Sequence, residues 1–346
     1  MIDIDGSFGS GGGAILRTAT ALSAITGEEV RVYNIRAGRP NPGLQAQHLE
    51  GLKAIAELCD GKLRNVGPGS EEISFTPGKI SSKEINIKIG TAGSIGLIFQ
   101  TLALPAGLAE REVTINVSGG ATFGKWAPPL LTTRNILLPI LGKMGYKADI
   151  KILKNGFYPA GGANAEIRIH PFKNLQPLHL EKLGKITFLG GASVSAIHLK
   201  SSRVAERQAR EAEAGLKKFS PIIKEEYVQA ECPGSGIVLW ATDGKCILGS
   251  DCIGERGKRA EDIGREASLN LLRTINSGCT VDEKISDQVL LFMALAEGRS
   301  KVIAPRLTNH AKTNIWLIKK FLGTEFKTVE TQRNVTIECE GNNKLH

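Results

Sequence analysis

The order of apolar and polar positions predicts helices alternating with strands along most of the chain. Apolar runs of helical length occur at 13–26, 44–60, 94–109, 128–143, 286–297 and 312–322, and four of them are followed by glycine. Shorter runs rich in valine and isoleucine predict strands at 30–35, 72–76, 85–89, 113–118, 147–153, 165–170 and 335–340. Six helices in about three pairs indicate an α+β fold in which one unit is repeated three times.

The segment 184–279 interrupts this order. It predicts a strand at 186–199, an amphipathic helix at 203–219, further strands, and a helix at 258–276. Turn residues predict one hairpin at Asp243-Gly244 and another at Asn155-Gly156. We therefore expect a large domain formed by 1–183 and 280–346, with a small α/β domain inserted at 184–279.

The composition is that of a globular protein with an excess of positive charge. Hydrophobic residues make up 41% of the chain and charged residues 23%, and the net charge is +9. An excess of this size favours nucleic acid or nucleotide phosphate as a partner. The uncharged stretch 89–109 is long enough to span a bilayer, but its glycines, hydroxyl residues and Gln100 predict a loop and a buried helix instead. No membrane association is expected, and scattered cysteines without C-x-x-C pairs indicate reduced thiols in a cytoplasmic protein.

The glycine-rich segment 5–14 follows a short strand and opens a helix, as in dinucleotide-binding folds. The strand at 30–35, however, ends at Asn34 without the acidic residue that would hold a ribose. None of the Gly-Lys dipeptides is followed by serine or threonine, so the chain has no Walker A loop. A nucleotide must therefore be bound in another way.

Positively charged and amide side chains gather at predicted helix starts. Arg36 and Arg39 precede the helix that carries Gln47 and His48, and Arg17 lies one turn into the helix after the glycine-rich loop. Guanidinium groups beside free N–H groups at a helix N-terminus form an anion site. The alternative is that the three arginines are solvated surface residues.

Three further polar features accompany apolar helices. Ser286-Asp287-Gln288 begins a helix that is apolar on every side, where the polar residues either cap the helix or face a pocket. Gln100 is isolated among apolar residues and needs a hydrogen-bonding partner if buried. His310 lies in a polar loop at a helix start and is the candidate catalytic histidine, the alternative being an exposed histidine in a capping loop.

Taken together, these motifs resemble those of the RNA 3′-terminal phosphate cyclases. The matching stretches lie in family order along nearly the whole chain: 5–17, 35–49, Gly93-Ser94 with Gln100-Thr101, 118–122, 156–162, Asp287-Gln288, and His310 with Thr313-Asn314. The resemblance implies a large domain of three βαβ-type repeats, each like the C-terminal domain of a bacterial translation initiation factor.

The resemblance also implies an activity and a set of site residues. The reaction is the ATP-dependent conversion of an RNA 3′-phosphate to a 2′,3′-cyclic phosphodiester, through AMP attached to His310 and then to the RNA. Arg17, Arg36 and Arg39 would bind phosphate, and Gln47, His48 and Asn314 the RNA. The residues implied for ATP are Gln100, Pro128, Lys284, Ile285, Ser286, Asp287 and Gln288.

Two departures from the family pattern leave parts of this site open. Ser10 replaces a glutamate associated with a divalent metal, so the ligands of Mg or Mn are not predicted. Lys284 replaces an aromatic residue, so the way adenine is held is also open. Two other interpretations are a non-catalytic relative that acts in ribosome assembly, against which His310 argues, and an enolpyruvyl transferase. The chain has no aromatic-rich motif for reading bases, which predicts weak RNA sequence preference.

Overall fold

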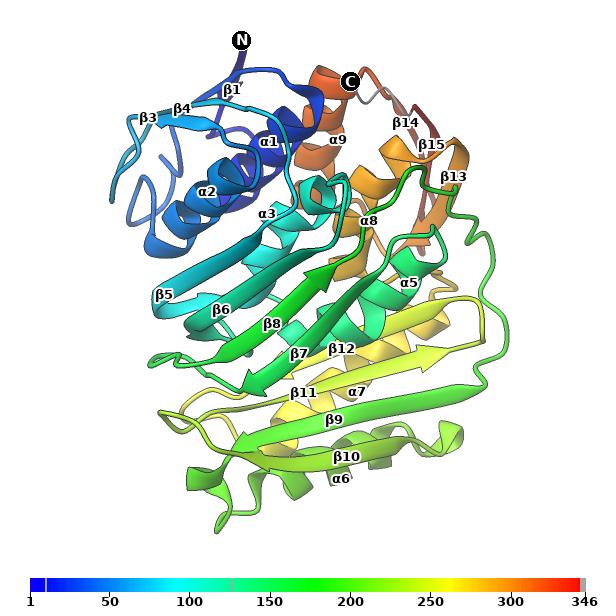
Figure 1. Ribbon diagram of the computed structural model, residues 1–346. Coiled ribbons are helices and arrows are strands. Elements are labelled where there is room, and N and C mark those ends of the chain that lie inside the picture. Colours follow the sequence, from blue (N-terminus) through cyan, green and yellow to red (C-terminus); the bar gives the residue numbers. More distant parts are fainter. Residues whose placement is uncertain (10, 126, 343–346) are drawn as a thin grey trace.

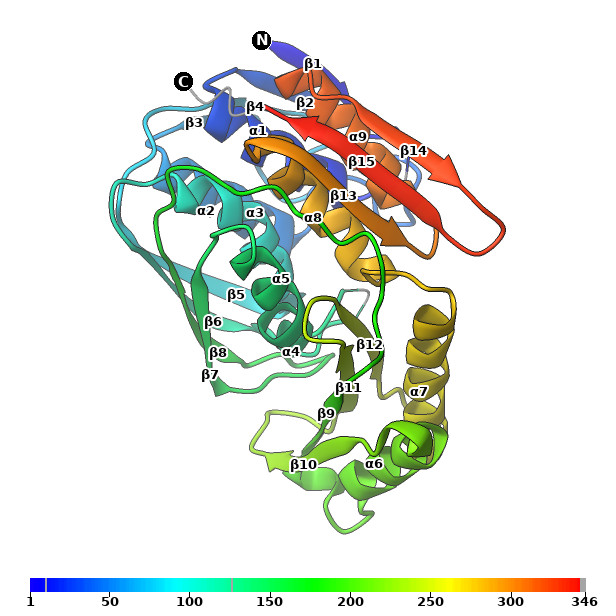
Figure 2. The same cartoon turned by 90° about the vertical axis from the view of Figure 1, so that its right-hand side faces the viewer.

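The computed structural model describes residues 1–9, 11–125 and 127–342, and it has a mixed α+β fold (Figure 1). In the described part of the chain the strands form four small sheets. Helices from different segments of the sequence pack together between the sheets, as the view from the side also shows (Figure 2). The α+β class expected from the sequence is confirmed.

The first unit runs from residue 2 to residue 76. Its elements are β1 (Ile2–Asp5), α1 (Gly13–Thr26), β2 (Val30–Tyr33), α2 (Ala46–Leu58), β3 (Lys62–Arg64) and β4 (Ile73–Thr76). The strand order is β1-β2-β4-β3. The first pair is parallel, and β4 is antiparallel to both of its neighbours.

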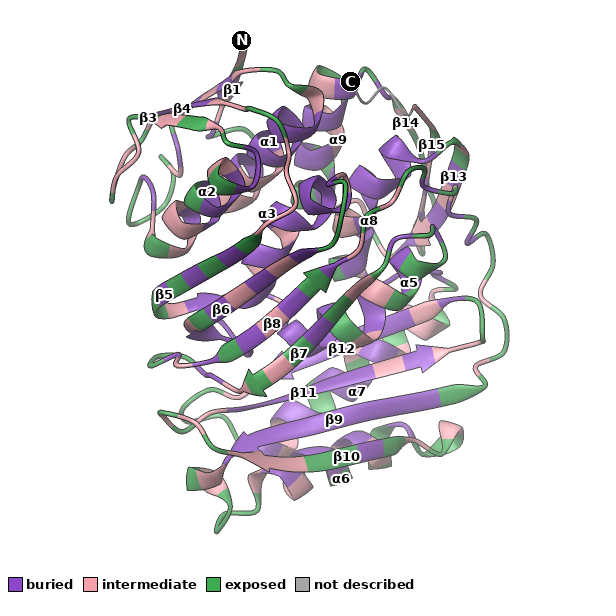
Figure 3. Ribbon diagram, in the orientation of Figure 1, coloured by how far each residue is buried: buried purple, intermediate pink, exposed green. Residues whose placement is uncertain are grey.

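The second unit repeats this arrangement. Its elements are β5 (Glu84–Ser94), α3 (Ile95–Gly107), β6 (Val113–Ala121), α4 (Leu130–Thr132), a π-helix (Thr133–Leu137), α5 (Leu138–Gly142), β7 (Ala148–Lys154) and β8 (Asn164–Ile169). The order β5-β6-β8-β7 has the same parallel first pair and the same antiparallel partners as the first sheet. Buried and exposed residues alternate along these strands, so one face of this sheet is polar (Figure 3).

The third unit is formed by the end of the chain. Its elements are α8 (Glu283–Leu295), β13 (Gly298–Ala304), α9 (Asn309–Leu322), β14 (Phe326–Glu330) and β15 (Val335–Gly341). The order β13-β15-β14 is that of the other two sheets without their first strand. The three units thus share one topology, while their likeness to a translation initiation factor stays a prediction.

A fourth sheet lies between the second and third units in the sequence. Its elements are β9 (Phe188–Ala196), α6 (Val204–Gly215), β10 (Ile222–Val228), β11 (Ser235–Thr242), β12 (Ile247–Ile253) and α7 (Ala260–Asn276). The order is β10-β9-β11-β12, and both helices pack on this sheet around a separate apolar cluster that includes Leu239 and Leu271. The domain boundaries at 183/184 and 279/280 stay predictions.

Several predicted boundaries differ from the structure for local reasons. Helix α8 begins three residues earlier than expected, because the Asp282 carboxylate accepts the N–H groups of Lys284 and Ile285 at 3.0 Å each and caps the helix. The hairpin at Asp243-Gly244 is confirmed by the antiparallel pair β11 and β12. The hairpin at Asn155-Gly156 is also confirmed, because β7 and β8 are antiparallel, but the two strands are joined by the segment 155–163 and not by a two-residue turn. The Asn155 side chain instead accepts a hydrogen bond from Thr122 at 2.8 Å.

The apolar stretch 89–109 was predicted to be a loop and a buried helix, but residues 89–94 are the end of β5, and Gly90 and Thr91 are exposed. Its second half forms α3, whose residues are nearly all buried, including Phe99 and Leu102. Among the described residues no helix combines the length and the apolar character needed to cross a membrane.

Candidate active site

A chain of hydrogen bonds links three helices that are far apart in the sequence. Arg17 on α1 donates to Gln100 on α3 at 3.5 Å, and Gln100 donates to Gln288 on α8 at 3.0 Å. Gln288 in turn donates to the backbone carbonyl of Lys284 at 2.8 Å. Gln100 thus has the partner that its isolation in an apolar run required. The structure brings these four predicted site residues together.

Asn314 connects α9 to the same group of helices. Its amide oxygen accepts a hydrogen bond from Thr18 at 3.0 Å, and its amide nitrogen donates to the carbonyl of Asp287 at 2.8 Å. The side chain is buried. Asn314 therefore fixes α9 against α1 and α8, and a contact with substrate stays a prediction.

Arg17 and Asp287 act on each other electrostatically, and both have shifted pKa values. Burial lowers the pKa of Arg17 to about 10, against the opposing effect of Asp287. Burial and the negative charge of Asp282 raise the pKa of Asp287 to about 7, although Arg17 acts to lower it. At neutral pH Arg17 is therefore charged, and Asp287 holds a proton more strongly than an ordinary aspartate.

The glycine-rich loop after β1 lies between α2 and α9. A Cβ atom on Gly13 would lie 2.1 Å from Nε2 of His48 and 3.1 Å from the Arg17 guanidinium, so both side chains approach this glycine closely. Gly9 has a φ of +61°, and a Cβ there would lie 2.3 Å from the Thr313 hydroxyl. The glycines thus allow three helices to meet around one loop. Ser10, in the same loop, lies outside the described residues.

His48 stabilises the start of α2. Its Nδ1 accepts the backbone N–H of Gln45 at 3.2 Å, and it is part of a capping box. Burial, followed by the positive charges of Arg17 and Arg36, lowers the pKa of His48 to about 3. The neighbouring Gln47 accepts the backbone N–H of Ser94 at 3.2 Å and so connects α2 to the start of α3. Both residues therefore have structural roles, and their roles in RNA binding stay predictions.

The low pKa of His48 predicts a pH dependence of stability. Below about pH 6.5 an unfolded histidine binds a proton that His48 in the folded protein does not accept, so stability falls as pH falls from about 6.5 towards 3. The variant His48→Gln keeps an acceptor for Gln45 but cannot titrate. Between pH 7 and 5, urea unfolding should show the wild type losing about 2 kcal/mol more than this variant. Parallel losses in the two proteins would contradict a neutral, buried His48.

Arg36 and Arg39 lie in the loop before α2, in two different environments. Arg36 has a φ of +57° and is partly buried, and its Nη1 donates to the carbonyls of Asn41 at 2.5 Å and Gly43 at 2.9 Å. Burial and the charge of Arg39 lower the pKa of Arg36. Arg39 is exposed. Arg36 therefore shapes the loop that presents Arg39, and it is not a freely solvated residue.

His310 lies in the first turn of α9. The Thr308 hydroxyl caps this helix by accepting the N–H of Ala311 at 2.9 Å. His310 is exposed as a whole, yet partial shielding of its side chain, followed by the charges of Arg17 and Arg39, lowers its pKa. The imidazole is therefore neutral at pH 7. Two histidines and three arginines thus act on one another around the glycine-rich loop.

The remaining residues predicted to bind ATP lie at separate places, with Pro128 beside α3 and Ile285 and Ser286 buried in α8. The Pro128 carbonyl would lie 3.4 Å from a Cβ on Gly96, beside the first turn of α3. The side chains of Ile285 and Ser286 are fully buried, and Ser286 donates to the carbonyl of Glu283 at 2.8 Å. Their part in ATP binding stays a prediction.

Lys284 has a partner that the sequence did not reveal. Its ammonium group pairs with the Asp251 carboxylate on β12, and the other oxygen of Asp251 accepts a hydrogen bond from Thr132 at 3.1 Å. Asp251 is buried. A lone acidic residue inside the apolar run 247–253 is the signal that could have marked it. Asp251 therefore connects strand β12 of the fourth sheet to the first turn of α8.

This ion pair predicts a measurable loss of stability. The variant Lys284→Met leaves the buried Asp251 carboxylate with Thr132 alone. The free energy of unfolding should fall by about 1–3 kcal/mol, less than for a fully buried pair because 46% of the Lys284 side chain is exposed. The control Arg306→Met breaks an exposed pair with Glu283, which lies on the same helix as Lys284. This variant should lower the free energy of unfolding by less than about 1 kcal/mol. Equal losses in urea unfolding would show that Asp251 does not depend on Lys284.

The described residues contain no group of three or more histidine, cysteine, aspartate or glutamate side chains arranged to hold a metal ion. The carboxyl group whose charge acts on Arg17 is that of Asp287. Ligands for Mg or Mn are therefore still not assigned on this chain.

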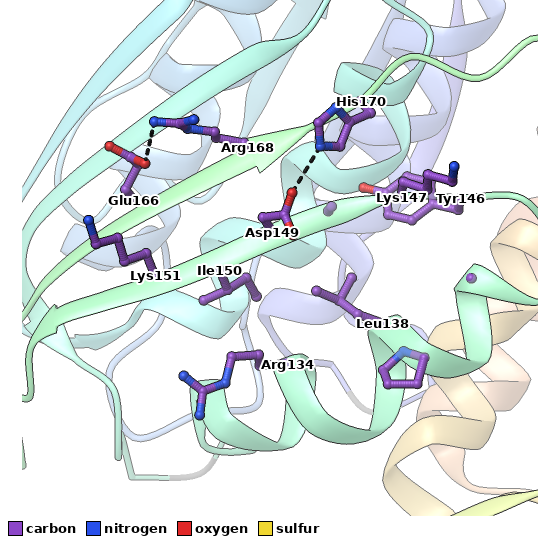
Figure 4. Close-up of a pocket in the computed structure, with 13 residues that line it drawn as sticks. Arg134, Leu138, Tyr146, Lys147, Asp149, Ile150, Lys151, Glu166, Arg168 and His170 are labelled. Atoms are coloured by element: carbon purple, nitrogen blue, oxygen red, sulfur yellow. Dashed lines mark hydrogen bonds and ion pairs between the residues drawn. The ribbon is translucent and has the colours of Figure 1, made fainter. Parts of the chain in front are cut away.

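A groove of about 710 Å³ lies elsewhere, along β7 and β8 and beside α5 (Figure 4). Two pairs of its charged side chains are in contact: His170 with Asp149 at 2.9 Å and Arg168 with Glu166 at 2.9 Å. None of the predicted site residues lines it. The groove is thus separate from the candidate active site.

Comparison with known proteins bears on what this site does. The sequence profile of the family described as RNA 3′-terminal phosphate cyclase matches residues 8–328. Proteins named RNA 3′-terminal phosphate cyclase are similar over nearly the whole chain. That of Pyrococcus abyssi is 44% identical and covers 94% of each chain, that of Methanopyrus kandleri is 43% identical and covers 93% of each, and that of Pyrobaculum aerophilum is 42% identical and covers 98% of each.

A solved structure of EPSP synthase from Acinetobacter baumannii overlaps with a TM-score of 0.24 at 11% identity, covering 99% of this chain and 65% of that one, which carries no argument about fold or activity. The profile and the named relatives agree with the family that the sequence motifs resemble. The chain therefore belongs to the RNA 3′-terminal phosphate cyclase family.

Proposed function

We propose that this protein is an ATP-dependent RNA 3′-terminal phosphate cyclase, which converts the 3′-phosphate of an RNA into a 2′,3′-cyclic phosphodiester. The observation that carries the proposal is the position of His310 in the first turn of α9, where the charges of Arg17 and Arg39 act on it and lower its pKa. A neutral imidazole beside guanidinium groups combines a nucleophile with an anion site. The names of the relatives support the same reaction.

In the first step, His310 is the nucleophile. A ring nitrogen attacks the α-phosphorus of ATP, so that an N–P bond forms while the bond to pyrophosphate breaks. The lowered pKa keeps the attacking lone pair free at pH 7. The positive end of α9 and the Arg17 charge stabilise the negative charge on the phosphates.

In the next steps, the arginines hold the RNA phosphate. An oxygen of the 3′-phosphate attacks the phosphorus on His310, and the N–P bond breaks as AMP passes to the RNA. The neighbouring 2′-OH then attacks the 3′-phosphorus, loses its proton, and expels AMP. This ring closure benefits from proximity, because the 2′-OH is held on the adjacent carbon. Arg17, Arg36 and Arg39 neutralise the charge that develops.

The amide and lysine groups on α3 and α8 are the proposed ATP contacts. Gln100 and Gln288 hold each other at 3.0 Å, and Lys284 is positioned by Asp251. A divalent ion is commonly bound by one or two carboxylates together with substrate phosphates. Asp287, beside Arg17, is the carboxyl group that fits this role. Mg or Mn bound there would neutralise phosphate charge.

Incubation with ATP labelled at the α-phosphate tests the proposal. The folded protein should become covalently labelled through a phosphoramidate that is labile to acid and stable to alkali. The labelled protein should then convert a 3′-phosphorylated RNA into the cyclic product with release of AMP. A binding protein of ribosome assembly or an enolpyruvyl transferase should remain unlabelled, so the absence of label on the folded protein would contradict the proposal.

A further inference from the structure

An aromatic pair lies beside the glycine-rich loop and has no role in the reaction described above. Phe8 stacks on Trp316 of α9, with ring centroids 4.2 Å apart and an angle of 22° between the rings. Trp316 is partly buried against the core, whereas 41% of the surface of Phe8 is exposed. Exposure of an apolar phenylalanine ring to water is energetically unfavourable. The Phe8 ring is therefore an exposed aromatic surface that Trp316 on α9 supports by stacking.

This aromatic pair is close to the candidate active site. Phe8 is followed directly by Gly9, which sits against Thr313 in the first turns of α9. Helices α1 and α9 lie side by side in both views (Figures 1 and 2). Trp316 follows His310 by six residues, about 9 Å along a helix axis. At roughly 3.4 Å per nucleotide, this is the length of two or three nucleotides.

The charge around the pair suits a polyanion. The Lys320 ammonium lies 5.1 Å from the centre of the Trp316 ring. Helix α9 also carries Lys312, and its sequence from Asn309 to Leu322 contains no acidic residue, whereas Lys319 is already paired with Glu325 at 2.7 Å. Aromatic rings beside positive charges are how proteins bind single-stranded nucleic acid, with bases on the rings and phosphates on the cations.

We propose that Phe8, supported by Trp316, stacks an unpaired base among the last three nucleotides of the RNA, with Lys320 beside the backbone phosphate. The inference rests on the proposed function and deepens it, because it names a single-stranded 3′ end as the substrate. Every base has a flat aromatic face, so stacking here selects for single strands without selecting a sequence.

The first test measures binding of a 3′-phosphorylated single-stranded RNA by fluorescence anisotropy without ATP. The variant Phe8→Leu keeps an apolar side chain on Trp316 but removes the aromatic face, and its Kd should rise roughly 5- to 100-fold. The variant Phe8→Trp should bind as tightly as the wild type. The control Phe188→Leu changes a residue of similar exposure, 44%, on β9 and should leave the Kd unchanged. Thermal melting followed by circular dichroism confirms that each variant is folded.

The second test locates the base. RNAs that lack one base at each of the last three positions are compared in wild type and Phe8→Leu. At one position, removal of the base should weaken binding to the wild type and have little further effect in Phe8→Leu. The same loss at all three positions in both proteins would overturn the proposal. So would a variant that binds RNA normally but ATP weakly, because the ring would then hold adenine. Labelling of the wild type with ATP tests the proposed function separately, since RNA binding is measured without it.

Discussion

Replacement of His310 by asparagine is expected to abolish both the covalent AMP adduct and the formation of cyclic phosphate. No other side chain in the first turns of α9 can replace the imidazole. Asn309 and Asn314 are amides and are not nucleophiles, and an ordinary lysine side chain is protonated at pH 7 and has no free lone pair. Asparagine keeps a polar side chain at the start of α9, and the Thr308 cap does not depend on residue 310. The fold and ATP binding should therefore persist.

A substrate that bypasses the nucleophile provides the control for this variant. An RNA already adenylated at its 3′-phosphate needs only attack by its 2′-OH, so His310→Asn should still cyclise it at an appreciable rate. Labelling with α-phosphate-labelled ATP, gel analysis and a thermal melt measure the three quantities. An adduct of the same acid lability on His310→Asn would show that another residue is the nucleophile.

Local patterns predicted most helices, because each is marked by apolar spacing and four of the six by a glycine after the last turn. Helix α1 has the predicted bounds, and α9 ends at Leu322 as expected, both with a glycine cap in the left-handed region. Short and polar strands were missed. Strand β14, for example, is mostly exposed and is held by pairing with β15. Such a strand is specified by its partner and not by its own sequence.

Only part of the candidate site could be predicted, because its contacts also depend on partners that are distant in the sequence. Motifs gave the residue types, but the contacts between Arg17, Gln100 and Gln288 cross three helices and have no sequence signal. Asp251 was missed because its partner Lys284 lies 33 residues away on another element. Phe8 and Trp316 were missed because two single aromatic residues form no motif. Long-range packing decides which of the local features become one site.

Replacement of Arg17 is expected to change both the rate and the pH dependence of the reaction. Arg17 lowers the pKa of His310 and also that of Asp287. Without its charge, the pKa of His310 should rise, so that a larger fraction of the imidazole is protonated at a given pH. In Arg17→Met the acidic limb of the rate of adenylation should therefore move to higher pH. Loss of a charge-assisted phosphate contact should lower cyclisation by roughly 10²–10³-fold.

The variant Arg17→Lys separates the charge of Arg17 from its geometry. Lysine keeps the positive charge, so the acidic limb should stay near that of the wild type. Its ammonium group cannot reproduce the forked contact of a guanidinium with a phosphate, so the rate should still fall. Pre-steady-state labelling with ATP between pH 5 and 8 measures both effects. A wild-type pH profile in Arg17→Met would mean that Arg17 does not act on His310. A wild-type rate in Arg17→Lys would mean that a single positive charge is all that the phosphate needs at this position.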